Sequence, residues 1–154
     1  MKKVFIFLSV AFTLFVVIVI TGIIFIGFKA NALYKGSQEY VDAAIPAIVS
    51  EWDKQELMNR ASPEFMDSVQ EYELNKLFSK YQGLGNLREY KSAERKARGF
   101  SFSSGRDGTI SVDYVAKVQF DSGSAEIKVS LIKHSGNWQI FKFQVNSKAF
   151  PTEI

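Results

Sequence analysis

Residues 110–145 read ISVDYVAKVQFDSGSAEIKVSLIKHSGNWQIFKFQV, and apolar side chains recur at every second position through most of this stretch. The clearest alternation is in 110–120, where the apolar positions are Ile110, Val112, Tyr114, Ala116, Val118 and Phe120. A period of two predicts strands with one buried face, here over 110–120, 125–131 and 138–145. The connectors 121–123 and 135–137 are short and contain glycine, as β-hairpins require. We therefore expect an antiparallel meander.

The last predicted strand carries apolar side chains on both faces. Simple alternation places Trp138 and Ile140 on one face, and Phe141, Phe143 and Val145 on the other. One layer of helices cannot cover both faces, so either the sheet curls strongly or one face meets a partner. An earlier strand is expected within 91–103, which gives four strands in all.

Upstream of the strands, the apolar residues follow a helical period. Val41, Ile45, Ile48 and Trp52 recur at i, i+4, i+7 and i+11, which predicts one buried helical stripe. We expect Ser37 to cap this helix at its N-terminus. Pro46 falls inside the stripe and is expected to kink the helix or divide it.

Two further helices are predicted before the sheet. Ser62-Pro63-Glu64 has a capping serine followed by proline at the first helical position. The candidates for burial in the helix that follows are Phe65, Met66 and Val69. A third stripe consists of Leu74, Leu77, Phe78 and Tyr81, and Gly83-Leu84-Gly85-Asn86 ends it. Helices followed by a meander predict an α+β domain, with the helices on one face of a curved four-stranded antiparallel sheet.

This order of elements resembles the cystatin-like, nuclear transport factor 2-like superfamily. The residues that carry the resemblance are the helix around Trp52, the turn 84–87 and the last hairpin 135–140, with its glycine-x-tryptophan sequence. The resemblance covers about residues 37–150 and implies a cone formed by a curved sheet and helices. In such families the cone holds an enzyme site, a ligand or only a core, so the resemblance implies a fold rather than a function.

The N-terminal part of the chain is a run of 25 residues without a charge, Val4–Phe28, of which 19 are Ile, Leu, Val or Phe. As a helix it would be about 37 Å long, against about 30 Å for the hydrocarbon core of a bilayer. We expect a transmembrane signal anchor over 4–28, a cytoplasmic tip at 1–3, a linker at 29–36, an extracytoplasmic domain at 37–150 and a tail at 151–154. Cleavage after Ala30-Asn31-Ala32, which has the small-x-small form, is the alternative. A run of 25 residues exceeds the 7–15 of a signal-peptide core.

Few lysines flank the run, with Lys2 and Lys3 before it and Lys29 and Lys35 after it, so the charge bias that sets orientation is small. A first span with three residues before it usually keeps its N-terminus in the cytoplasm. We therefore expect a single-pass protein of a bacterial inner membrane, with its domain in the periplasm or outside the cell.

The charge of the chain excludes some classes of function. Four of the 19 basic residues lie at or before Lys35, so 15 remain against 16 acidic residues from Gly36 onward. The basic character therefore belongs to the predicted anchor, and we expect no nucleic acid as a partner. The chain has no cysteine, which excludes disulfides and thiol chemistry.

No set of residues predicts catalysis, a metal site or a cofactor. His134 is the only histidine and falls in a predicted hairpin. Asp113 and Tyr114 are the residue types that enzymes of the resembled superfamily use for proton transfer, but adjacent strand residues point to opposite faces. Glu71 and Glu73 have the character of helix-surface carboxylates. We expect a protein that is not an enzyme.

Two sets of residues are candidates for binding. Aromatic side chains could line an apolar pocket for a lipid-like ligand, or simply fill the core; the pocket candidates are Trp52, Phe65, Tyr81, Phe100, Tyr114 and Phe143. A basic set could contact anionic headgroups, an acidic partner or the acidic helices of the domain itself, or remain solvated. This set is Arg88, Lys91, Arg95, Lys96 and Arg98, and Trp138 and Ile140 join it as candidates for partner contact.

The sequence therefore favours a membrane-anchored binding or assembly module, with a protein partner in an envelope complex. A domain that binds a hydrophobic small molecule or lipid in an aromatic-lined cone is the alternative.

Overall fold

The computed structural model describes the backbone of residues 2–96 and 110–150, and the side chains of the same residues apart from 2–11 and 25–31. Four helices precede four strands within this part of the chain. The elements are α1 (Lys2–Val49), α2 (Lys54–Arg60), α3 (Pro63–Ser68), α4 (Glu71–Gln82), β1 (Leu87–Arg95), β2 (Ile110–Phe120), β3 (Gly123–His134) and β4 (Asn137–Ser147). The prediction of an α+β fold with a four-stranded antiparallel meander is confirmed.

The chain divides into two compact units, Met1–Gly36 and Ser37–Ile154. In the first unit, the large apolar side chains between residues 12 and 24 are all exposed, from 37% at Val16 to 69% at Phe12. Counting only the residues that the structure describes, none of the helices is both long enough and apolar enough to cross a membrane.

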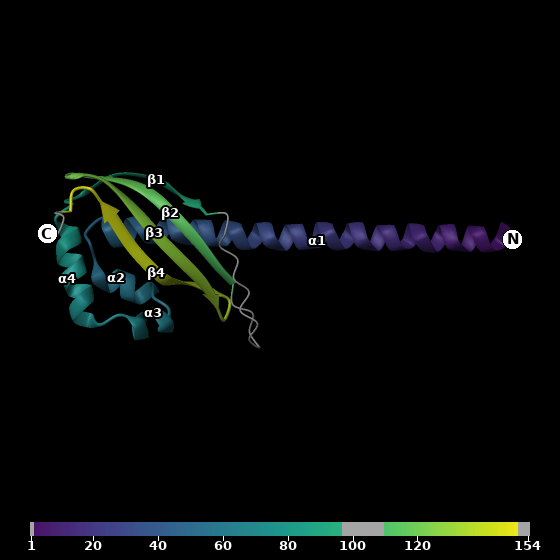
Figure 1. Ribbon diagram of the computed structural model, residues 1–154, viewed down its shortest axis with the longest axis horizontal. Helices are drawn as coiled ribbons and strands as arrows, with labels where there is room; N and C mark the ends of the chain where they lie inside the picture. Colours follow the sequence, from purple (N-terminus) through teal and green to yellow (C-terminus); the bar gives the residue numbers. More distant parts are fainter. Residues whose placement is uncertain (1, 97–109, 151–154) are drawn as a thin grey trace. The chain divides into compact units, whose positions relative to one another are not determined.

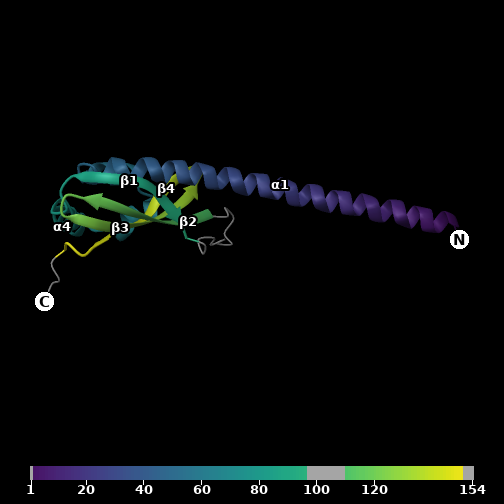
Figure 2. The same ribbon diagram turned by 90° about the horizontal axis from the view of Figure 1, so that it is seen from above.

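The second unit is built on one arched sheet with the strand order β1-β2-β3-β4, seen from two directions in Figures 1 and 2. Pairing is antiparallel throughout, and Tyr114 on β2 lies opposite Val129 on β3, which lies opposite Phe143 on β4. One face of β2 and β3 is buried as the alternation predicts. The buried residues on this face are Val112, Tyr114, Ala116, Val118, Phe120, Ala125, Ile127, Val129 and Leu131.

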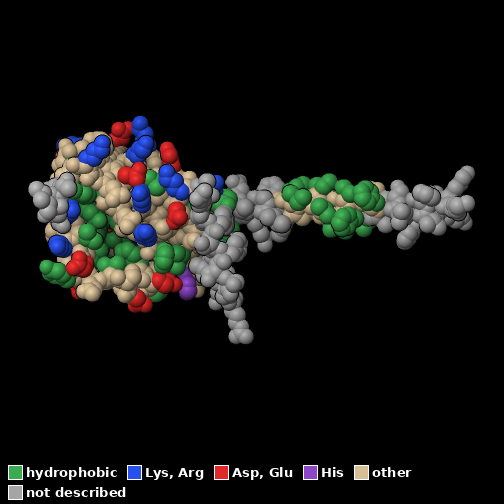
Figure 3. Space-filling view, in the orientation of Figure 1, with side chains coloured by type: hydrophobic (Ala, Val, Ile, Leu, Met, Phe, Trp, Pro, Cys, Tyr) green, Lys and Arg blue, Asp and Glu red, His purple; other side chains and the backbone are tan. Residues whose placement is uncertain are grey.

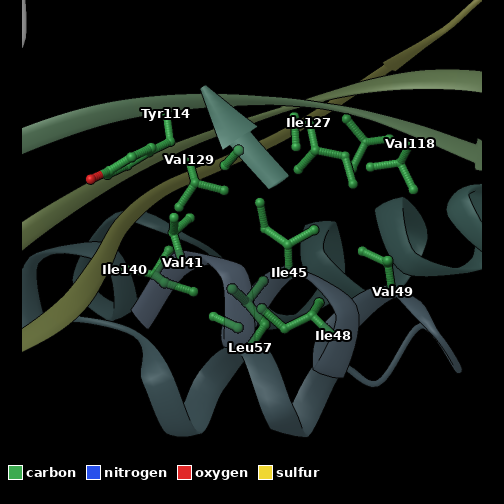
Figure 4. Close-up of a cluster of buried hydrophobic side chains, with 14 of the residues drawn as sticks. Val41, Ile45, Ile48, Val49, Leu57, Tyr114, Val118, Ile127, Val129 and Ile140 are labelled. Atoms are coloured by element: carbon green, nitrogen blue, oxygen red, sulfur yellow. The ribbon is translucent and has the colours of Figure 1, made fainter. Parts of the chain in front are cut away.

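The last part of α1 forms the centre of the domain. Five of its apolar side chains are at most 1% exposed, and Figure 4 shows several of them against the inner face of the sheet: Val41, Ala44, Ile45, Ile48 and Val49. Burial of each of the larger ones contributes about 1.5–3 kcal/mol. This segment is therefore a core element of the domain.

Two contacts show that this segment of α1 runs along β2. At one end, the Ser37 hydroxyl lies 2.7 Å from the Tyr114 hydroxyl. At the other end, just past α1, the Trp52 ring lies 5.1 Å from the Phe120 ring. Fifteen residues of helix cover about 22 Å and six residues of strand about 20 Å, so the two lengths agree.

One prediction about α1 is wrong, and of the two alternatives expected for Pro46 the division of the helix is excluded. Ser37 does not cap a helix; it lies inside α1, is fully buried and bonds to Tyr114. Pro46 does not divide the helix, which continues to Val49. The proline carbonyl still accepts the amide of Ser50 at 3.0 Å, and the buried Ile45 and Ile48 hold the helix on both sides of it.

The prediction for the faces of the last strand is also wrong. Leu131 pairs with Ile140 and Ser130 with Lys142, so Phe141 is the extra residue of a β-bulge. Because the bulge shifts the alternation by one position, Ile140 shares the buried face with Phe143 and Val145, and Phe141 is 45% exposed. The strand therefore does not have two apolar faces.

The start of α3 agrees with its prediction, since the amide of Phe65 donates to the Ser62 hydroxyl at 3.2 Å and Pro63 is the first helical residue. Burial of Met66 and Leu77 was predicted wrongly, because these side chains are 43% and 41% exposed. α3 has only six residues and buries Phe65 alone. The buried stripe of α4 is Leu74, Phe78 and Tyr81.

β1 starts at Leu87, four residues before the predicted strand, and residues 97–103 of that prediction lie outside the described residues. Two register shifts interrupt its pairing with β2, and Ala93 is its one fully buried residue. Because the register is irregular, buried residues do not recur at every second position of β1. The sequence of this strand therefore lacks the period-two pattern.

Candidate functional site

The residues predicted to line a pocket lie in the core. Trp52, Phe65, Tyr81 and Tyr114 are buried, and Phe143 is half-buried against the core. Phe100 lies outside the described residues. Trp52 contacts the rings of Tyr81 at 5.4 Å and Phe120 at 5.1 Å, and Tyr81 contacts the rings of Phe78 at 5.8 Å and Phe150 at 5.7 Å.

These residues do not form one aromatic group. Trp52 and Tyr81 lie near Phe120 at one end of β2, whereas Tyr114 is six residues away along the strand and bonds to Ser37. Between the two ends, the aliphatic side chains of α1 occupy the inner face of the sheet (Figure 4). The arrangement is that of interdigitated core side chains.

A polar cluster joins α1 to β1. One carboxylate oxygen of Asp42 accepts the Tyr90 hydroxyl at 2.5 Å and the Ala93 amide at 2.8 Å. The other oxygen accepts the side-chain amide of Gln38 at 2.8 Å, and that side-chain amide also donates to the Ala93 carbonyl. Burial, and then the bond to the Asp42 carboxylate, raise the pKa of Tyr90. These bonds hold α1 at the register shift of β1.

A second polar cluster joins the turn before β1 to the hairpin between β2 and β3. The carboxylate of Asp121 accepts the backbone amide and side-chain amide of Asn86 and forms an ion pair with Arg88. These contacts lower the pKa of Asp121, and the hydrogen bond from the Asn86 backbone amide has the largest effect. The hairpin is bonded further through Ser122, whose amide donates to the Leu84 carbonyl and whose hydroxyl donates to the Gly83 carbonyl.

The candidate catalytic residues are dispersed. Tyr114 points to the core, and Asp113 lies on the opposite face of β2. His134 is exposed near the β3–β4 hairpin, Glu71 forms an ion pair with Lys54 at 3.3 Å, and Glu73 is exposed. Among the described residues, no group of three His, Cys, Asp or Glu could hold a metal ion. The structure therefore brings none of these candidates together.

The predicted basic set lies along one edge strand. Arg88, Lys91 and Arg95 belong to β1 and Lys96 follows it, while Arg98 lies outside the described residues. Arg88 pairs with Asp121 and Lys91 with Glu89 at 3.3 Å, and the side chain of Arg95 also interacts within the protein. In Figure 3, basic and acidic side chains are interspersed on the upper part of the domain. The edge strand as a whole is therefore not a strongly positive surface.

The candidates Trp138 and Ile140 belong to the inner face of β4. Ile140 is fully buried, and its carbonyl accepts the amide of Ser62 at 2.9 Å. Trp138 is half-buried, and the Lys133 ammonium lies 5.4 Å from the centre of its ring. Of these two residues, only Trp138 remains accessible.

Sequence reasoning missed the cluster at Asp42 and the cluster at Asp121. A weak signal existed for the first, since Gln38 and Asp42 stand at i and i+4 directly beside the apolar stripe of the helix. The second cluster joins residues 35 positions apart, and only the fold brings them together.

Comparison with known proteins adds no assignment: no protein-family model matches the chain, and no curated protein matches it significantly.

Proposed function

We propose that this chain is a single-pass membrane protein that presents a non-enzymatic binding or assembly domain on the outer side of a bacterial inner membrane. Its partner would be a protein of an envelope complex. The N-terminus would remain in the cytoplasm.

The sequence of the first unit supports the anchor. Val4–Phe28 contains 19 large apolar residues and no charge. At about −0.3 to −0.6 kcal/mol for each large apolar residue near the bilayer centre, insertion of such a run is favourable by several kcal/mol. Lysines at 2, 3 and 29 bracket the run.

One observation carries the proposal: α1 includes both the uncharged run and Ser37–Val49, the buried centre of the domain. If the run lies in a membrane, the domain is held there by one of its own core elements. This arrangement suits a domain that acts at a fixed place on the membrane.

The backbone around Ala30-Asn31-Ala32 favours an anchor that is retained. These residues lie within α1. A protease binds its substrate as an extended segment, so this helix would have to unwind before cleavage. We therefore propose that the mature protein keeps its anchor.

The polar contacts of the domain support a role other than catalysis. Asp42 accepts two hydrogen bonds that join α1 to β1, and Asp121 accepts three that join the hairpin between β2 and β3 to Asn86 and Arg88. Tyr114 is bonded to Ser37 in the core. Each of these groups has a structural function in holding the domain together.

Labelling of single cysteines tests the anchor and its orientation. Because the chain has no cysteine of its own, Lys3→Cys and Lys148→Cys each introduce one reactive thiol. A maleimide that cannot cross membranes should label Lys148→Cys in cells whose outer membrane is permeable, and Lys3→Cys only after lysis. Release of the protein from membranes by alkaline carbonate would overturn the anchor, and equal labelling would overturn the orientation.

Crosslinking in cells tests the assembly role. The full chain should be recovered from gently solubilised membranes in a complex larger than the monomer, with the same partner each time. A chain recovered only as a monomer would contradict a role in assembly.

The aromatic group around Trp52 and Tyr81 keeps a second function open, the binding of a lipid-like ligand. Native mass spectrometry of a fragment starting at Leu33, purified from cells without detergent, separates the two functions. A bound lipid-sized mass that disappears in Tyr81→Ala would support ligand binding. A bare protein would favour the assembly role.

We also propose that the domain has the cone of the cystatin-like, nuclear transport factor 2-like fold. The observed order of helices, then an arched four-stranded meander that surrounds a helix, supports this proposal. An experimental structure in which the sheet is flat or differently ordered would contradict it.

A further inference from the structure

The two edges of the sheet are partly covered by the rest of the domain. At the β1 edge, the amide of Ala93 donates to Asp42 at 2.8 Å, and its carbonyl accepts the side-chain amide of Gln38 at 2.8 Å. At the β4 edge, the Ile140 carbonyl accepts the Ser62 amide at 2.9 Å. Such covering matters because the open backbone groups of an edge strand can pair with another chain.

The register of β4 shows which of its backbone groups face the free edge. In an antiparallel pair, the backbone groups of alternate residues point to the neighbouring strand and away from it. Ile140, Phe143 and Val145 lie opposite every second residue of β3, so all three have the same orientation. Because the Ile140 carbonyl faces the free edge, the amides and carbonyls of Phe143 and Val145 face it too.

Between these covered positions, the edge is open at Phe143. Tyr81 covers the Val145 end: burial raises the pKa of the Tyr81 hydroxyl, and an interaction with the Val145 backbone partly offsets that effect. No other residue in the described part of the chain bonds to the Phe143 amide or carbonyl on the side of the free edge. The contacts at Ile140 and Val145 are four β3 residues apart, about 13 Å. This gap has room for about three residues of an extended segment.

Apolar side chains surround the open stretch. Phe141 is 45% exposed beside Phe143 on β4, and Met66 is 43% exposed on α3, which packs against β4. Leu77 is 41% exposed one helical turn before Tyr81, and so lies on the same side of α4. Figure 3 shows hydrophobic side chains gathered in a hollow below β4, in the lower left part of the domain. We call the open backbone of Phe143 and the side chains of Phe141, Leu77 and Met66 the β4 recess.

The charges around the β4 recess are of both signs. Glu73 lies one turn before Leu77 on α4. Lys142 lies opposite Ser130, on the outer face of the sheet, and the Lys80 ammonium lies 5.2 Å from the centre of the Phe150 ring. The β4 recess therefore does not select a strongly charged ligand.

The open backbone groups decide which kind of ligand fits. A hydrocarbon chain has no donor or acceptor for the Phe143 amide and carbonyl, whereas an extended polypeptide has both. The domain already pairs an extended segment with this edge. Ala61 forms a parallel bridge with Ile140, and the backbone of Ala61 and Ser62 is extended.

From these observations we infer that the β4 recess binds a short extended segment of a partner protein, which pairs with the backbone of Phe143. The inference rests on the proposed assembly function and names the surface and the kind of partner segment that serve it. Side chains alternate between the two faces of a strand. The bound segment should therefore have apolar residues at every second position, directed to Phe141 and Leu77, and polar residues between them.

Photocrosslinking in cells tests the inference with the full chain. A benzophenone amino acid is placed at Phe141 or at Leu77, in the β4 recess. Tyr72 is the matched control, because it is 73% exposed on the same helix as Leu77. It stands nine residues before Tyr81, which places it on the opposite face of α4. The two recess positions should give an adduct with the same protein, at a partner segment with alternating apolar residues, and the Tyr72 position should give none.

Substitution then measures what the recess contributes. With the crosslinker at Leu77, Phe141→Ser should lower the yield of the adduct at least about fivefold, as for an aromatic side chain central to an interface. Tyr72→Ser removes an aromatic ring that is also exposed, and it should leave the yield unchanged. Neither side chain is buried, so neither change should unfold the domain.

Several results would overturn the inference. They are an adduct with lipid alone, an adduct within one chain or between two copies of it, and equal effects of Phe141→Ser and Tyr72→Ser. If a partner crosslinks at Tyr72 and not at Phe141 or Leu77, the proposed assembly role stands and only the inference fails. If no position gives an adduct and the chain is recovered only as a monomer, the proposed function fails, and the inference fails with it.

Discussion

The indole N–H of Trp52 donates to the carbonyl oxygen of Gly85 across 3.2 Å, and this bond joins the end of α1 to the turn that precedes the sheet. Trp52 has a φ of 51°, in the left-handed region, and the amide of Asp53 donates to the Ile48 carbonyl at 2.9 Å. A left-handed residue followed by such a bond is the feature that the Schellman motif uses to end many helices, usually with glycine at the left-handed position. A tryptophan there costs about 1–2 kcal/mol of backbone strain, which burial of the ring offsets.

Replacement of Trp52 should therefore destabilise the domain strongly. Trp52→Ala should lower the free energy of unfolding by about 3–5 kcal/mol, because the ring is 4% exposed and contacts Tyr81 and Phe120. Trp52→Phe, which loses mainly the bond to Gly85, should cost about 1–2 kcal/mol. Urea unfolding of a fragment starting at Leu33 measures both. Trp138→Phe is the control, and a cost equal to that of Trp52→Phe would contradict the assignment.

Gly85 should tolerate no side chain. Its φ is +77°, and a Cβ atom there would lie 2.7 Å from the Asp121 Cβ. Gly136 has a similar φ of +89°, but a Cβ atom there would have no neighbour within 4 Å. Gly136→Ala should therefore cost only the backbone strain, about 1–2 kcal/mol. Gly85→Ala should cost at least about 1 kcal/mol more. Equal costs in urea unfolding would show that the contact with Asp121 is relieved easily.

Acid should weaken the domain partly through Asp121. Because the pKa of Asp121 is lower in the folded state, its contribution to stability is complete above the ordinary carboxyl pKa, near 4. That contribution is lost as the pH falls through the lowered value. Asp121→Asn should reduce the dependence of unfolding on pH below about 4. Thermal unfolding from pH 6 to pH 2 measures this, and an unchanged slope in the variant would contradict it.

Alkali should weaken the domain partly through Tyr90. The raised pKa of Tyr90 means that its contribution is present below the ordinary tyrosine pKa, near 10, and is lost as the pH rises above it. Tyr90→Phe should reduce the loss of stability above about pH 10. Burial also raises the pKa of Tyr40 and Tyr81, so some alkaline sensitivity should remain. Unfolding that is equally steep in alkali with and without the Tyr90 hydroxyl would exclude this role.

Because of the β-bulge at Phe141, the side chains of Phe141 and Phe143 differ in burial although they are only two positions apart. Phe141→Ala should change the free energy of unfolding by less than about 1 kcal/mol, because the ring is exposed. Phe143→Ala should cost about 1–3 kcal/mol, because its half-buried ring lies against the core. Simple alternation without a bulge predicts similar burial for both rings. Similar costs in the two variants would therefore contradict the bulge.

The sequence predicted the parts of the fold that have a regular period. The strand 110–120 and the stripe of Val41, Ile45 and Ile48 are buried as expected, because one face of each meets one core. The cap at Ser62 was predicted because capping depends on adjacent residues.

Predictions failed where a distant contact changed a local rule. Ser37 is a good capping residue, but Tyr114 binds its hydroxyl and α1 continues through it. Ile140 changed face because one inserted residue shifted the register of β4. For the candidate sites, the sequence supplied the residue types but not where the fold places their side chains. Arg88 and Lys96 are eight positions apart in one basic set, yet β1 places them at opposite ends of the sheet.

The position of Ser37–Val49 in the core also determines where the domain could be separated from a membrane. A cut before Ser37 would leave with the domain every side chain of α1 that is buried among the described residues. A cut after Val49 would leave Val41, Ile45 and Ile48 on the N-terminal fragment, and the sheet would lose the helix that packs against its inner face. Shedding of a folded domain would therefore require cleavage at or before Gly36, whereas cleavage a few turns later would destroy the fold.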